Sequence, residues 1–114
     1  MRLKRQIPYA VAMEMLLTGR ILDAEEALRW GLVTHVVPKG EGLAKAHEIA
    51  AVIAASGPLS VAATKASAIE TGWLPEVDAG PIESGYAARV VSSNDAREGM
   101  RAFRDKRPPE FTGT

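Results

Sequence analysis

The side chains of this sequence that could act as a general acid or base are mainly carboxylates. Glu83 lies in the middle of a predicted helix, where a carboxylate could be buried and paired. A structural ion pair explains such a carboxylate more often than catalysis does, so the pattern assigns no catalytic residue. The remaining glutamates considered are predicted at helix surfaces or caps, namely Glu14, Glu25, Glu26, Glu41, Glu48, Glu70 and Glu76.

The sequence offers little for thiol chemistry, for metal binding or for the common catalytic and phosphate-binding motifs. The sequence has no cysteine, which excludes disulfides, thiol nucleophiles and cysteine-ligated metals. Its two histidines, His35 and His47, are too few and too far apart for a zinc site, and each is more consistent with a structural role. The sequence also lacks a Gly-x-Ser-x-Gly elbow, a P-loop, a Gly-x-Gly-x-x-Gly stretch and an HExxH motif. We therefore expect no metal and no covalently bound cofactor.

Composition narrows the function classes further. The 114 residues include 14 basic and 14 acidic side chains, a balance that argues against nucleic acid or an anionic membrane as the main partner. No apolar run approaches the roughly 20 residues of a membrane helix, and the basic N-terminus lacks the apolar segment of a secretory signal. A nucleic-acid-binding arm at residues 1–6 is one alternative, but we expect a solvated end. We predict a soluble cytoplasmic protein, and the length corresponds to one domain at most or to part of a larger one.

Local structure is predicted best in the stretch Leu16–Pro38. Asp23 is a good N-cap for a short helix, and Glu26 has the spacing to reach back to the cap in a capping box. Gly31 is a natural left-handed end for that helix. Leu32–Val37 then has the β-branched composition of a short strand, which Pro38 ends.

The rest of the chain is predicted to be helical. Gly80-Pro81 should break or sharply kink one helix, because proline lacks the backbone donor and clashes with the preceding turn. The last helix should begin at an N-cap among Ser92-Ser93-Asn94, with Met100 and Phe103 pointing inward. The predicted class is mostly α, with one short strand that lacks an obvious partner. The predicted helices cover Pro8 to about Gly19, Asp23 to Gly31, 43–55, 59–71, 75–92 and a last one to about Lys106.

Several motifs together resemble the enoyl-CoA hydratase/isomerase (crotonase) family. The stretch Ala12–Pro38 contains TGR, AEEA, GLV and VVP in the order and spacing of that family. The resemblance continues through GPLSVAATK at Gly57–Lys65 and through SNDAREGMRAFRDKRPPEF at Ser93–Phe111. It covers essentially the whole chain and corresponds only to the C-terminal portion of the family.

This resemblance implies a fold and an assembly. Members have a crotonase-like α/β spiral of ββα units followed by a C-terminal helical region, and they assemble as trimers or as hexamers. Residues 1–38 would form the end of a core-adjacent helix, a capped helix and a short strand. Residues 39–114 would form the helical region of trimerisation and coenzyme A contact.

The resemblance also implies a division of chemistry. The full-length enzyme would act on acyl-CoA thioesters, for example by hydrating a 2-enoyl-CoA with an oxyanion hole and acid–base glutamates. Those groups precede the stretch that Met1-Arg2-Leu3 resembles, so no catalytic residue is expected in this chain. Phe103 and Lys106 match the aromatic and the lysine that contact the nucleotide of coenzyme A. The alternative is a stand-alone helical module for oligomerisation or interaction, without catalysis.

Overall fold

The computed structural model describes residues 2–114, so Met1 lies outside the described residues. This part of the chain forms seven helices and no strand, which confirms the mostly α prediction. It divides into two compact units, the first ending at His47 and the second beginning at Glu48. Helix α4 (Gly42–Ala54) contains the division between them.

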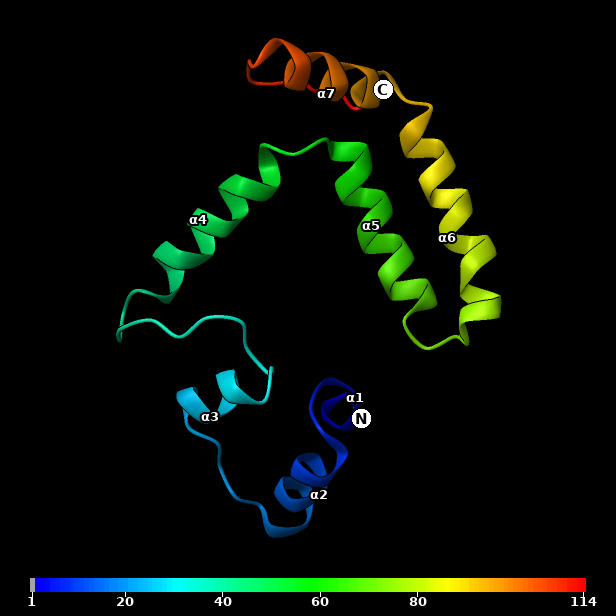
Figure 1. The fold of residues 1–114 in the computed structure, drawn as a ribbon. Coiled ribbons are helices and arrows are strands. Elements are labelled where there is room, and N and C mark those ends of the chain that lie inside the picture. The colour runs from blue at the N-terminus through cyan, green and yellow to red at the C-terminus, as the bar shows by residue number, and fades with distance from the viewer. Residues whose placement is uncertain (1) are drawn as a thin grey trace. The chain divides into compact units, whose positions relative to one another are not determined.

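The first unit contains α1 (Leu3–Gln6), α2 (Tyr9–Thr18) and α3 (Ala24–Arg29) (Figure 1). Helix α2 begins directly after Pro8, and Gly19 is its C-cap, in agreement with the predicted end of the helix. Gly19 has a φ of 69° and donates its N–H to Met15 O at 2.9 Å, which satisfies one of the last carbonyls of the helix.

Helix α3 has only half of the predicted capping box. Asp23 accepts the Glu26 N–H at 2.7 Å, as predicted. The Glu26 carboxylate does not return to the cap, because it receives both terminal nitrogens of Arg20, at 2.8 and 3.0 Å, and Trp30 Nε1 at 3.3 Å. The bidentate guanidinium is the stronger partner for a carboxylate than one backbone N–H, and it lowers the pKa of Glu26.

The predicted strand at Leu32–Val37 is wrong. Gly31 takes the left-handed conformation as predicted, with a φ of 74°. The Leu32 N–H then turns back to Ala27 O at 2.9 Å and completes the end of α3. The remaining segment stays irregular, because no second strand exists within residues 2–114 to pair with its backbone groups.

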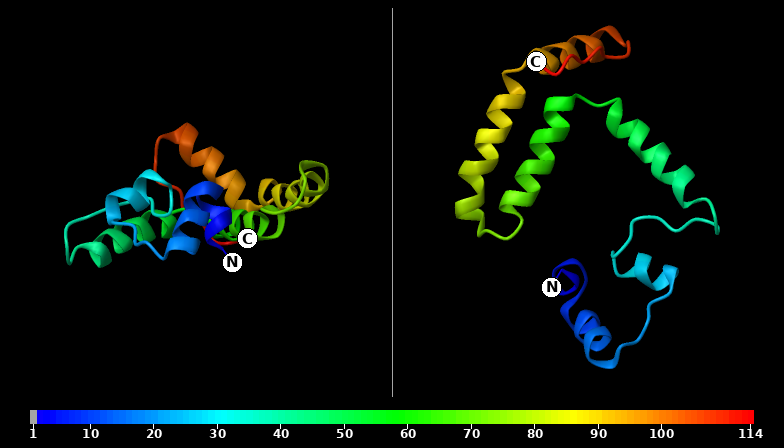
Figure 2. Two further views of the ribbon diagram at one scale, coloured as in Figure 1. Left: turned by 90° about the horizontal axis from the view of Figure 1, so that it is seen from below. Right: turned by 180° about the vertical axis from the view of Figure 1, so that it is seen from behind.

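The second unit continues from α4 into α5 (Pro58–Thr71), α6 (Glu76–Val91) and α7 (Asn94–Asp105). Helices α5 and α6 lie side by side in opposite directions, as Figures 1 and 2 both show. Polar side chains join them: Tyr86 donates its hydroxyl to Glu70 at 2.8 Å, and Thr71 donates to Glu83 at 3.2 Å.

Of the break or sharp kink predicted at Gly80-Pro81, the break is wrong. Helix α6 runs from Glu76 to Val91 with Pro81 inside it. The missing donor removes a single hydrogen bond of the ladder, and packing against α5 supports the helix.

Few side chains of the described residues are buried. The buried apolar residues are small apart from one isoleucine, and they are Ile7, Ala12 and Ala27 in the first unit and Ala79 and Ala102 in the second. Large apolar side chains remain exposed, including Leu17 at 78% and Ile21 at 90%. Among the described helices none alone is long and apolar enough to span a membrane, and only α4 and α5 taken together, bent by 111°, meet the length and composition criteria.

Candidate functional site

Helix α7 and its C-cap carry the two residues that the sequence assigns to nucleotide contact, namely Phe103 within the helix and Lys106 at the C-cap. Its start is fixed by Ser93, whose hydroxyl accepts the Ala96 N–H at 3.0 Å and donates to Val90 O at 2.6 Å. This confirms an N-cap in the predicted Ser92–Asn94 stretch and ties α7 to the last turn of α6.

The C-terminal tail folds back over the first turn of α7. Asp95 is buried, and its two carboxylate oxygens accept the N–H groups of Thr112 and Gly113, at 2.7 and 2.9 Å. The Thr114 carbonyl in turn accepts the Asn94 N–H at 2.7 Å. The buried charge is thereby satisfied by backbone donors, and the tail holds the helix at its N-terminal end.

The other end of α7 has an unusual backbone. Lys106 follows the helix with a φ of 51°, and it is the only residue other than glycine with positive φ among residues 2–114. Its N–H donates to Phe103 O at 3.3 Å, and the Arg107 N–H donates to Ala102 O at 3.0 Å. This pair of bonds is the Schellman motif, in which the left-handed position usually belongs to glycine. A lysine in that position adopts a conformation that is unfavourable for a side chain with a Cβ.

A charge pair closes the turn after Lys106. Arg107 donates two hydrogen bonds to Glu98, at 2.6 and 3.0 Å, and the Glu110 N–H adds a third to the same carboxylate at 3.0 Å. The guanidinium, followed by that backbone donor, lowers the pKa of Glu98 to about 2. The same carboxylate raises the pKa of Arg107. We call this group, Glu98 with Arg107 and the Glu110 N–H, the α7 clasp.

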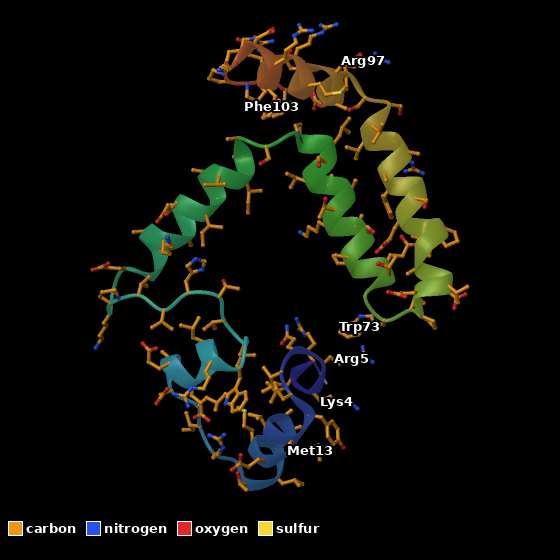
Figure 3. The ribbon with its side chains drawn as sticks, in the orientation of Figure 1. Lys4, Arg5, Met13, Trp73, Arg97 and Phe103 are labelled. Atoms are coloured by element: carbon orange, nitrogen blue, oxygen red, sulfur yellow. The ribbon has the colours of Figure 1, made fainter. Side chains whose placement is uncertain are left out.

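Phe103 lies on the last turn of α7 and is labelled there in Figure 3. Its side chain is 88% exposed and that of Met100 is 66% exposed, so the prediction that both point inward is wrong for the described residues. The helix is amphipathic, but the described chain supplies nothing to cover this apolar side. Phe103 therefore presents its ring to solvent within the unit.

Lys106 is also exposed, and its ammonium has no hydrogen bond or ion pair with any residue in the described range 2–114. Its neighbours differ, because Arg107 is held by Glu98 and Arg104 contacts Asp105 at 3.0 Å. The structure therefore places two exposed residues, the aromatic Phe103 and the cationic Lys106, within one turn of the chain at the end of α7.

The other candidates from the sequence do not join this site. Glu83 accepts a hydrogen bond from Thr71 and makes no ion pair within the described chain. His35 approaches Thr34 at 3.0 Å, and the described residues contain no group of acidic or histidine side chains that could hold a metal ion. The α7 clasp was not predicted from the sequence. Its signal is the nine-residue spacing from Glu98 to Arg107, which crosses the end of the helix.

Comparison with known proteins fixes the family. The model of the enoyl-CoA hydratase/isomerase family matches residues 1–114. The chain is 50% identical over 110 residues to enoyl-CoA hydratase EchA19 of Mycobacterium tuberculosis, covering 96% of this chain and 41% of that protein. It is 44% identical over 123 residues to the carnitinyl-CoA dehydratase of Proteus mirabilis, covering 99% of this chain and 45% of that protein.

Solved structures agree with this match. An enoyl-CoA hydratase of Mycobacterium tuberculosis superposes with a TM-score of 0.91 at 44% identity, covering 99% of this chain and 45% of that one. Enoyl-CoA hydratase EchA1 of Mycobacterium marinum gives a TM-score of 0.93 at 42% identity, with 99% and 45% coverage. The chain belongs to the enoyl-CoA hydratase/isomerase family. It spans less than half the length of these relatives, in agreement with the expected correspondence to the C-terminal portion of the family.

Proposed function

We propose that this chain supplies the nucleotide contact for coenzyme A in an enoyl-CoA hydratase/isomerase. The ring of Phe103 would cover the adenine, and the ammonium of Lys106 would meet a phosphate of the nucleotide. The observation that carries the proposal is an 88% exposed aromatic residue at the end of one helix, followed within one turn by a lysine that has no partner among residues 2–114. An aromatic face can stack on a purine, and an ammonium acts as a compact point charge toward phosphate.

The electrostatics at the end of α7 favour Lys106 over its neighbours for this role. Arg107 already gives two charge-assisted hydrogen bonds to Glu98. A guanidinium held in this way would have to lose those bonds before it could contact a phosphate. Lys106 has no such partner to lose within residues 2–114.

The reaction of the whole protein follows from the family and is part of the same proposal. The enzyme would act on acyl-CoA thioesters, for example by hydrating a 2-enoyl-CoA, as a trimer or hexamer in the cytoplasm. Residues 39–114 would serve oligomerisation and coenzyme A contact. The resemblance assigns the oxyanion hole and the acid–base glutamates to a part of the family that this chain does not match, so we propose that these 114 residues alone do not catalyse hydration.

Nucleotide binding is the direct test of this function. Adenosine 3′,5′-bisphosphate contains the adenine, the 3′ phosphate and the first 5′ phosphate of coenzyme A, and adenosine lacks both phosphates. Phe103→Ala should weaken the binding of both compounds, because each contains the adenine. Lys106→Ala should weaken only the bisphosphate, by about tenfold for one charge-assisted contact. Unchanged binding of the bisphosphate by both variants would contradict the proposal.

A stand-alone interaction module remains the second candidate, and one observation favours it. Large apolar side chains are exposed on α2 and after it, with Leu17 and Ile21 as examples, and such surfaces often mark contacts between proteins. Light scattering of the chain, with and without a full-length member of the family, tests this function. A dilute monomer that does not bind the relative would exclude the module.

A further inference from the structure

The α7 clasp suggests a role for Glu98, a residue to which no contact with the nucleotide has been assigned. Glu98 lies two turns before the end of α7, and its side chain is 19% exposed. It gathers three donors from the segment that follows the helix: two from Arg107 and one from the Glu110 backbone. One carboxylate thus fixes the path of the chain on the C-terminal side of Lys106.

The backbone bonds of the Schellman motif fix the path on the other side of the same residue. Lys106 N–H donates to Phe103 O and Arg107 N–H to Ala102 O. Lys106 is held between these two sets of contacts in the left-handed conformation. Because glycine would adopt this conformation without a steric cost, a lysine there needs surrounding contacts that maintain it. The clasp provides such contacts.

The geometry points to Glu98 as a positioning residue for Lys106. We propose that the clasp does two things at once: it withdraws Arg107 from competition for the anion, and it holds the left-handed turn that presents the Lys106 ammonium beside the Phe103 ring. This inference rests on the proposed nucleotide contact. The inference goes further than that contact, because it makes phosphate recognition depend on an acidic residue.

The proposal makes a prediction opposite in sign to simple charge counting. Glu98→Gln removes one negative charge near the site, so overall electrostatics alone would strengthen the binding of an anion. If Glu98 positions Lys106, the same change should weaken the binding of adenosine 3′,5′-bisphosphate by about tenfold, as expected for a misplaced charge-assisted contact. Binding of adenosine should not change, because the phosphate contact is the one affected.

Asp105→Asn is the matched control. Asp105 is also acidic, also lies near Lys106, and also contacts an arginine, Arg104, at 3.0 Å. This substitution removes the same charge and releases an arginine without removing a hydrogen bond of the clasp. Binding of the bisphosphate should be unchanged or tighter in this variant. Equal behaviour of Glu98→Gln and Asp105→Asn would overturn the positioning role.

The experiment is an NMR titration of the 114-residue chain with the two compounds, repeated in a Lys106→Ala background. In that background Glu98→Gln should cause no further loss, because Glu98 acts through Lys106. An equally large further loss would show that Glu98 acts in another way. If Lys106→Ala alone has no effect, the proposed nucleotide contact fails, whereas loss with Lys106→Ala but not with Glu98→Gln refutes only the positioning role.

A second variant covers the case in which Glu98→Gln does not fold, which circular dichroism would reveal. Arg107→Lys keeps the charge but cannot form the two-pronged contact with a carboxylate. It should also reduce the preference for the bisphosphate over adenosine. A folded Arg107→Lys variant with the wild-type preference would contradict the role of the clasp.

Discussion

The left-handed conformation of Lys106 leads to a prediction in which stability and binding change in opposite directions. At a φ of 51°, a side chain with a Cβ costs roughly 1–2 kcal/mol relative to the ordinary helical conformation. Glycine avoids this cost but loses more conformational freedom on folding, by roughly 0.5–1 kcal/mol. The difference predicts that Lys106→Gly stabilises the chain by about 0.5–1 kcal/mol.

Lys106→Ala is the control for this substitution. Alanine keeps the Cβ and therefore the strained backbone, so the free energy of unfolding should stay within about 0.5 kcal/mol of that of the unchanged chain. Both variants lack the ammonium, and both should lose the preference for adenosine 3′,5′-bisphosphate over adenosine. Compared with the unchanged chain, Lys106→Gly should thus be more stable and should bind the bisphosphate less well.

Urea unfolding followed by circular dichroism, with the slope compared between variants, measures the free energy of unfolding. A Lys106→Gly variant that is no more stable than Lys106→Ala would refute the claim of backbone strain. A stabilised Lys106→Gly variant that keeps the phosphate preference would refute the claim that the lysine is present for its charge.

Three further predictions concern the elements around the site. The pKa of Glu98 falls from 4.5 to about 2 on folding, so the stabilisation from its pairing is complete above pH 4.5 and should be lost as the pH falls toward about 2. The NMR signals of the Arg107 side chain should report this loss, and a clasp that stays intact below pH 2 would contradict it. Asp95→Asn should cost about 1–3 kcal/mol in urea unfolding, because the amide cannot accept both tail N–H groups, while the exposed control Asp78→Asn should cost little. Pro81→Ala should raise the free energy of unfolding by about 1–3 kcal/mol in the same assay, because alanine restores the missing backbone donor, and a destabilised variant would disprove this reasoning.

Features set by neighbouring residues were predictable from sequence. Gly19 and Gly31 end their helices in the left-handed conformation, and Asp23 and Ser93 cap theirs, because these effects depend only on residues within one turn. The family resemblance likewise depended on short motifs in a fixed order, and the match over residues 1–114 confirmed it.

Features that depend on distant partners were not predictable in this way. Glu26 does not bond back to the cap, because Arg20, which lies outside the helix, binds its carboxylate more strongly than the cap N–H would. The strand composition at Leu32–Val37 could not produce a strand without a second strand to pair with. Helix α6 passes through Pro81 because packing along α5 outweighs local propensity.

The candidate site shows the same distinction. The types of Phe103 and Lys106 and their spacing could be recognised from the family motif. The exposure of Phe103, the backbone of Lys106 and the pairing of Arg107 with Glu98 emerged only from the fold of the tail and the end of α7.

The central claim is that Phe103 and Lys106 contact the nucleotide of coenzyme A. Intermolecular nuclear Overhauser effects between the chain and bound adenosine 3′,5′-bisphosphate test it most directly. The proposed contact predicts nuclear Overhauser effects between the Phe103 ring protons and the adenine protons. It also predicts a shift of the Lys106 side-chain signals that adenosine alone does not cause. Bound nucleotide whose adenine contacts other residues and not Phe103, or a chain that does not bind the nucleotide, would contradict the claim.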